Sequence, residues 1–294
     1  MRKRDGFLLA FMVLFVVVFA AAVLTNLGGW GGQDGLSGFG NKVALVEING
    51  QIESSAQVVR QLRYYAKQSN VAAVVIRLDS PGGGVAASQE IFEEIGKLRD
   101  GGKVVVASMG SVAASGALYI ACGVDTVVAN PGTLTGSIGV IFQFPVFEGL
   151  MDKVGIRLET IRSGEFKDVG NPGRSITPRE EEMLQSVIDD TYEQFVDVVA
   201  EGRRLDRDSV LALATGAIFT GQQALDLGLV DVLGNYQDAI DLAGSMAGLD
   251  SDPPTVRQAE RRTFRWLDLL GDWLGHPTEF ESTRGPRLAY LFKY

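Results

Sequence analysis

Three turns rich in glycine or serine hold the residues of this 294-residue chain that are best suited to chemistry. Ser115 lies in the second turn, between Ala114 and Gly116, where an otherwise apolar helix is expected to begin. Small neighbours leave a serine hydroxyl open to a substrate, and amide hydrogens at a helix start stabilise a developing anion. Ser115 is therefore a candidate nucleophile. A helix N-cap, or a small residue in a tight helix contact, is the alternative for the same stretch.

A nucleophilic serine needs a base, and histidine is almost missing from the chain. The one histidine, His276, lies far from Ser115, so a Ser-His-Asp triad would require the tail to fold back into the core. The one cysteine, Cys122, stands in an apolar run and is expected to be a small buried hydrophobe. The base should therefore be a residue of another type.

Lysine is the remaining candidate for the base. Between Lys103 and Lys293 the only lysines are Lys153, at an apparent helix end, and Lys167. A lysine acts as a general base when desolvation lowers its pKa enough to leave the amine neutral. Lys167 is thus the candidate base, and the alternative is a surface lysine paired with one of its acidic neighbours, Glu165 or Asp168.

The first turn, residues 79–84, reads Asp-Ser-Pro-Gly-Gly-Gly and follows an expected strand. Consecutive glycines let the backbone approach a ligand closely, and their amide hydrogens can point at an oxyanion. An ordinary strand-to-helix turn explains the same residues, so this motif alone does not decide between the two.

These turns connect strands and helices that alternate from Val43 onward. The patterns predict strands at residues 43–48, 71–78, 103–107, 124–129, 138–142 and 158–161, and helices at 54–68, at 86–98, from 113 and after Pro178. The near-continuous apolar run from Val71 to Leu78 is typical of a strand that is buried on both faces. The chain therefore predicts one α/β domain over residues 42–250.

Distinct segments precede and follow this domain. Residues 1–27 combine a basic start with an uncharged apolar run from Phe7 to Leu24, which is long enough to span a bilayer. The basic flank predicts a cytoplasmic N-terminus and an exported domain, and a cleavable signal peptide is the alternative. Residues 28–41 resemble a flexible tether. Residues 251–294 form a tail whose amphipathic helix, Phe264–Leu274, suits either a membrane surface or a neighbouring subunit.

Four motifs together resemble signal peptide peptidase A in its short, single-domain form. They are, in order, Asp-Ser-Pro-Gly-Gly at 79–83, Ser-Val-Ala-Ala-Ser-Gly at 111–116, Leu-Thr-Gly-Ser-Ile-Gly-Val at 134–140 and Ser-Gly-Glu-Phe-Lys-Asp at 163–168. The resemblance covers residues 43–246 and implies an α/β fold of the ClpP/crotonase type. It also implies a cell-membrane serine endopeptidase that degrades remnant signal peptides, needs no cofactor, and forms a homo-oligomer with active sites shared between subunits.

The resemblance assigns a role to each matching position. Ser115 falls at the nucleophile and Lys167 at the general base, and Ser137 falls at a serine that hydrogen-bonds the lysine. Gly82 and Gly116 fall where backbone amides form the oxyanion hole. The chain departs from the family at residues 117 and 118, where Ala-Leu replaces the usual Gly-Tyr. This departure leaves the shape of the neighbouring pocket open.

Other functions explain parts of the same sequence. A net charge of −9 argues against a nucleic-acid partner, because no basic stripe is available to neutralise phosphates. A crotonase-type hydratase or isomerase would need a carboxylate at the site and would have no use for a membrane anchor. A quality-control protease for membrane or misfolded proteins, and an inactive peptide-binding scaffold, remain as alternatives.

The C-terminal end, Arg287–Tyr294, is apolar and lacks turn residues. An extended apolar segment that contains a small alanine is what a signal-peptide groove should accept. The sequence therefore predicts that this end can occupy the groove of its own or a neighbouring subunit. The alternative is a disordered end, or one packed elsewhere on its own subunit.

Overall fold

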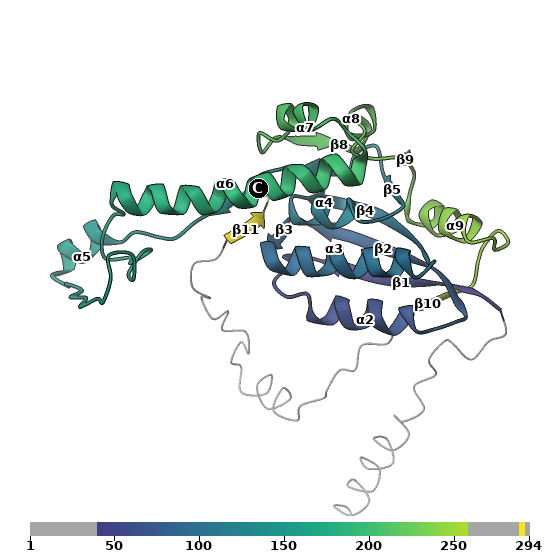
Figure 1. Cartoon of the computed structure of the whole chain (residues 1–294), viewed down its shortest axis with the longest axis horizontal. Coiled ribbons are helices and arrows are strands. Elements are labelled where there is room, and N and C mark those ends of the chain that lie inside the picture. The colour runs from purple at the N-terminus through teal and green to yellow at the C-terminus, as the bar shows by residue number, and fades with distance from the viewer. Residues whose placement is uncertain (1–39, 258–287, 292–294) are drawn as a thin grey trace, which may run out of the picture.

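The centre of the molecule is an eight-stranded sheet, seen in a computed structural model that describes residues 40–257 and 288–291. Six strands follow the order β10-β1-β2-β4-β5-β9 and pair in parallel (Figure 1). These strands are β1 (Lys42–Asn49), β2 (Val71–Ser80), β4 (Val104–Ala114), β5 (Thr126–Ala129), β9 (Val232–Leu233) and β10 (Thr255–Arg257). The α/β class predicted from the alternating pattern is confirmed.

Helices cover both faces of this sheet because side chains alternate along each strand. On β1, Ala44 and Val46 join the larger core with α2 (Ala56–Ala66), α3 (Val85–Asp100) and α4 (Gly116–Ala121). Val43 and Leu45 point the other way and pack with Ala239 and its neighbours on α9 (Tyr236–Met246). Strand β2 is buried on both faces, as its apolar run predicts.

Strand β4 is longer than the sequence predicts, and this lengthening sets the position of Ser115. A helix was expected from residue 113, but β4 continues to Ala114 because it pairs in parallel with β6 (Leu134–Gly136) after it leaves β5. Strand β6 in turn pairs with β8 (Ile218–Thr220), which lies between α7 (Arg207–Leu213) and α8 (Gly221–Asp226). The predicted strand at 138–142 is accordingly replaced by β6 and by the short β7 (Ile141–Phe142).

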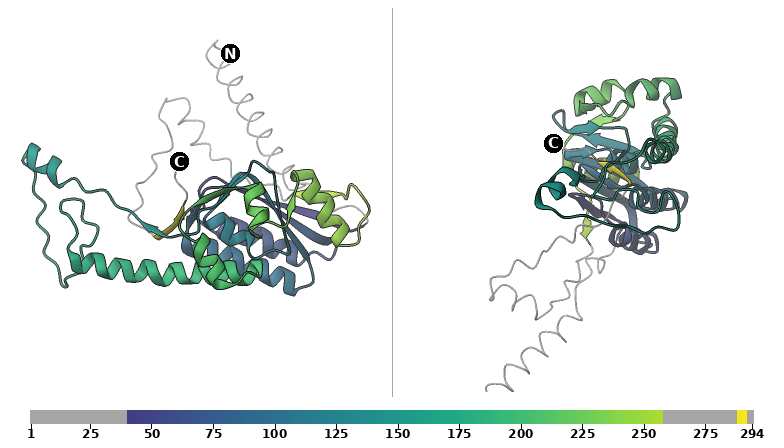
Figure 2. Two further views of the ribbon diagram at one scale, coloured as in Figure 1. Left: turned by 90° about the horizontal axis from the view of Figure 1, so that it is seen from above. Right: turned by 90° about the vertical axis from the view of Figure 1, so that its left-hand side faces the viewer.

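Residues 143–190 extend from the rest of the molecule and are called the arm; the other described residues are the body. The arm contains α5 (Glu148–Val154), an irregular segment, and the first half of α6 (Pro178–Arg203) (Figures 1 and 2). A helix of 26 residues is roughly 39 Å long, so α6 reaches well beyond the sheet. The strand predicted at 158–161 is wrong: the stretch has no regular structure, because no strand lies beside it to complete its hydrogen bonds.

A second, three-stranded sheet joins distant parts of the chain. Its order is β3-β11-β7, where β3 is Gly82–Gly84 and β11 is Leu288–Leu291. The C-terminal strand pairs antiparallel with both neighbours. It therefore lies between the glycine-rich turn and the start of the arm (Figure 1).

The predicted anchor at residues 7–24, the tether up to residue 39, and the predicted tail helix at 264–274 lie outside the described residues. Within the parts of the chain that are described, no helix has both the length and the apolar character needed to cross a bilayer.

Candidate active site

Ser115 stands at the junction where β4 ends and α4 begins. Its backbone has φ 55° and ψ −116°, a region that residues other than glycine rarely adopt and that costs of order 1–3 kcal/mol. Two hydrogen bonds hold this turn: the Ser115 amide donates to the Gly136 carbonyl at 2.8 Å, and its carbonyl accepts from the Tyr119 amide at 2.9 Å. The sharp turn is thus fixed from both sides.

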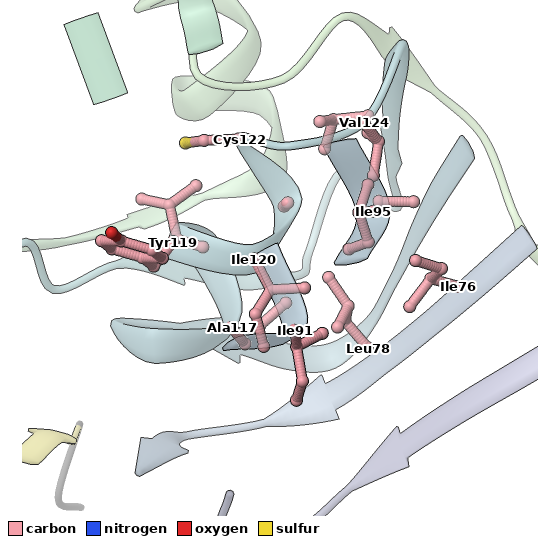
Figure 3. Packing of buried hydrophobic residues seen from close by; sticks show 14 of the residues in the cluster. Ile76, Leu78, Ile91, Ile95, Ala117, Tyr119, Ile120, Cys122 and Val124 are labelled. Carbon is pink, nitrogen blue, oxygen red and sulfur yellow. The ribbon is translucent and has the colours of Figure 1, made fainter. Parts of the chain in front are cut away.

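The helix behind Ser115 is anchored by a wholly apolar contact surface. All six residues of α4 are buried, and Figure 3 shows Ala117 and Ile120 packed near Leu78 of β2 and Ile91 of α3. Cys122, at the end of this helix, is buried as predicted, and burial raises the pKa of its thiol to about 12. A helix held this firmly gives the serine little freedom to move.

The Ser115 hydroxyl is buried and has no hydrogen-bond partner. It is the one buried side-chain polar atom in this state among residues 40–257. Ser115 occupies the N-cap position of α4, but its side chain makes no capping hydrogen bond. Leaving a buried hydroxyl unsatisfied costs about 1–3 kcal/mol, and such a group calls for an explanation.

Asp79 supports the same turn, although the sequence reading did not single it out. Its carboxylate accepts a hydrogen bond from the Val112 amide at 3.1 Å. A Cβ atom at Gly110 would lie 2.7 Å from the Asp79 Cγ atom, so only glycine fits there. Asp79 therefore bends β4 three residues before Ser115. The one available signal was the position of Asp79 at the carboxyl end of β2.

The glycine-rich turn lies next to this junction, because Ser80 pairs with Ala113 in the β2–β4 register. Gly82 has φ 100°, which favours glycine, and its amide donates to the Ser80 hydroxyl at 3.1 Å. An oxyanion at Gly82 would have to take the place of that hydroxyl. Gly116, the first residue of α4, has an amide with no acceptor inside the helix. Both glycines thus lie close to Ser115 along the sheet.

Ser137 lies near Ser115 in the sheet through the pairing of β4 with β6. Ala114 is paired with Gly136, the residue before Ser137, and Ser137 is nearly buried. Its backbone also has a positive φ, 53°, and its amide donates to the Ala217 carbonyl at 2.7 Å. Two serines in unusual backbone conformations therefore meet at one end of the sheet.

Lys167 is not part of this cluster within one subunit. It is exposed and belongs to the irregular segment of the arm between α5 and α6, which both views place away from α4 (Figures 1 and 2). The alternative of a surface lysine matches this exposed position, but the expected pairing with the acidic neighbours is not formed. Arg179 pairs with Glu165, and Arg162 and Arg174 pair with Asp168.

The C-terminal strand β11 pairs with strands of the body. Residues 289–291 of β11 are paired with Gly84, Gly83 and Gly82, in that order. On its other side, β11 pairs with Ile141 and Phe142. An extended chain is therefore held between β3 and β7, beside the turn that precedes α4.

Comparisons with known proteins agree with this architecture. Residues 41–133 match the model of the Clp protease family, and residues 97–250 match that of Peptidase family S49. Together with the sheet and its covering helices, the first match defines a ClpP-like α/β fold. A mutant of ClpP1 from Listeria monocytogenes aligns with a TM-score of 0.47 and 18% identity, over 67% of this chain and 94% of that one.

Relatives identify the family. A protein of Synechocystis sp. whose name describes a protease is 46% identical over 72% of this chain and 76% of its own length. A protein of Enterococcus faecium named for signal peptide peptidase SppA is 34% identical over 86% of this chain and 77% of its own. The chain belongs to Peptidase family S49 and is a serine peptidase.

Proposed function

We propose that this chain is a membrane-anchored endopeptidase that degrades remnant signal peptides, with Ser115 as nucleophile and Lys167 as general base. The observation that carries the proposal is the buried Ser115 hydroxyl, which has no partner among the described residues and sits on a strained, firmly anchored turn. A hydroxyl held in this way is available to donate its proton to a base that another part of the complete site supplies.

The chemistry follows from these assignments. The neutral Lys167 amine takes the proton of Ser115 as its Oγ bonds to the scissile carbonyl carbon. The Gly82 and Gly116 amides stabilise the oxyanion, and the Ser137 hydroxyl orients the lysine. The intermediate then expels the leaving amine, which takes the proton from the lysine. Finally, a water molecule activated by the same amine hydrolyses the acyl ester.

Lys167 reaches Ser115 from an adjacent subunit in this proposal. Of the 13 large hydrophobic side chains exposed among the described residues, nine lie on the arm, too many for a surface that only faces water. They are Val146, Phe147, Leu150, Val154, Ile156, Leu158, Ile161, Phe166 and Val187. Packing the arm against a second copy would bury these residues and carry Lys167 to that copy's Ser115. The protein is therefore proposed to be a homo-oligomer with shared sites.

The substrate class follows from the groove and from the N-terminal run. Strand β11 shows that an extended chain fits between β3 and β7. Because β3 consists of glycines, we expect this space to suit apolar peptides with small residues. The apolar run at residues 7–24 would keep the peptidase at the membrane where such peptides remain. The Enterococcus faecium relative is named for cleavage of signal peptides. These features support an exported catalytic domain.

Two measurements test the proposal. A fluorophosphonate probe should label wild-type protein at Ser115 and leave Ser115→Ala unlabelled, because only an activated serine reacts. Mass spectrometry of products from a panel of signal peptides, with folded and misfolded membrane proteins for comparison, should show cuts within signal peptides. Absence of labelling would favour an inactive scaffold, and cleavage of misfolded proteins alone would favour a quality-control protease.

A further inference from the structure

The turn that carries Lys167 is fastened to the start of α6 by a group of arginines. The Lys167 amide donates to the Gly164 carbonyl at 3.2 Å, which closes the turn. The next residue, Asp168, is held by Arg174 through contacts of 3.0 Å at Nη2 and 3.2 Å at Nε. Arg162 pairs with the same carboxylate. Arginine engages a carboxylate with two donors in a fixed geometry, so this contact sets the direction of the turn.

Arg174 also binds a second carboxylate, on α6. Its Nη1 donates to Glu180 Oε2 at 2.8 Å, and the Glu180 side chain is 1% exposed. Glu180 completes a capping box with Thr177 at the first turn of the helix. The Arg174 guanidinium, followed by the Thr177 amide, holds the pKa of Glu180 down at about 2. Arg174 thus connects the turn of Lys167 to the first turn of α6.

The two acidic residues next to Lys167 in sequence are both paired with arginines. Glu165 is bound by Arg179 of α6 at 2.9 Å, and Asp168 is bound by Arg162 and Arg174. From α5, Glu148 contacts this segment, where its carboxylate accepts from the Ser175 amide at 3.0 Å. Within residues 40–257, no carboxylate forms an ion pair with Lys167, although acidic residues stand on both sides of it.

We propose that Arg174 and Arg162 are positioning residues for Lys167. They fix its turn on α6, and they occupy Asp168 so that this carboxylate does not capture the lysine. A free carboxylate beside an ammonium favours the protonated form, which cannot accept the proton of a serine. This inference rests on the proposed function, because it requires Lys167 to be the base.

The test is the pH profile of kcat/KM for Arg174→Gln in the full-length protein. Removing one of the two arginines that bind Asp168 should move the pH of half-maximal kcat/KM upward by about half a unit to one unit. Activity at neutral pH should then fall about 3- to 10-fold, and most of it should return at alkaline pH. Arg162→Gln should give a smaller shift in the same direction. Since this variant leaves Glu180 paired, it also decides the matter if Arg174→Gln fails to fold.

Two further variants serve as controls. Adding Asp168→Asn to Arg174→Gln removes the negative charge of residue 168. The pH profile should then return towards that of the wild type. Arg207→Gln breaks a similar bridge to Glu193 and Asp197 on the body side of α6, and should leave the profile unchanged. A uniform loss of rate at every pH, or the same shift in Arg207→Gln, would overturn the inference. Full activity in Lys167→Ala would instead overturn the proposed function itself.

Discussion

The body and the arm differ in whether their large hydrophobic side chains are buried or exposed. Every large hydrophobic side chain that is fully buried among the described residues belongs to the body, whereas most exposed large hydrophobic side chains lie on the arm. The body therefore folds around its own core and prepares Ser115, Ser137 and the glycine turn. The arm carries the Arg174 network near its outer end, where α6 begins (Figure 1). Under the proposed function, this difference means that one subunit completes the nucleophile half of the site, while the base half comes from the arm of a neighbour.

The largest expected effect comes from removing either half of the site. Ser115→Ala and Lys167→Ala should each lower kcat by at least about a thousandfold, because a nucleophile and its base act as a unit. Lys167→Arg should be equally inactive, since a guanidinium stays protonated. His276→Ala should remain near wild type. Steady-state peptide cleavage measures all four, and a His276→Ala as damaging as Ser115→Ala would contradict the lysine assignment.

A mixing experiment tests whether body and arm cooperate between subunits. Ser115→Ala and Lys167→Ala protein, each inactive, should regain activity when co-assembled in equal amounts. If a site takes its serine from one subunit and its lysine from the next, about a quarter of the sites are intact in a random mixture. A sample that contains only Ser115→Ala protein, taken through the same procedure, provides the baseline. Activity that stays at this baseline, in particles shown to be mixed, would place both residues in the same subunit.

The apolar surface of the arm should matter for assembly rather than for folding. Ile161→Asp, at a side chain with full exposure, should weaken association and lower activity roughly tenfold at low protein concentration, with recovery at high concentration. Val232→Asp on β9, another exposed apolar position, is the matched control and should leave assembly intact. Sedimentation velocity and activity over a dilution series measure both. Equal behaviour of the two variants would remove the arm from the interface.

The same division explains what the sequence could and could not predict. Ser115 and the glycine turn were recognisable because small residues at strand ends follow local rules, and the buried strand β2 follows from its apolar run. The continuation of β4 past Gly110 was not predictable, since it depends on pairing with β6, some 20 residues later. Residues 158–161 have the apolar pattern of a strand. They lie exposed on the arm, however, and pair with no strand among the described residues.

The smallest expected effect concerns the C-terminal strand, which pairs with two strands of the body next to the start of the arm. Strand β11 occupies the space between β3 and β7 where a substrate strand is proposed to bind. A tethered segment competes at high effective concentration, so deleting residues 288–294 should lower the apparent KM for short peptides roughly two- to tenfold. The value of kcat should stay unchanged, because the deletion removes none of the residues with a proposed catalytic role.

Deleting residues 292–294 alone is the matched control, because β11 ends at Leu291 and the three-stranded pairing stays possible. Apparent KM should then remain close to wild type. Intact mass measurement adds an independent readout: if the groove also trims the tail, wild-type protein should lose C-terminal residues on standing, while Ser115→Ala keeps its full mass. An unchanged KM after the long deletion, together with equal C-terminal masses of wild type and Ser115→Ala, would show that β11 neither blocks the groove nor serves as its substrate.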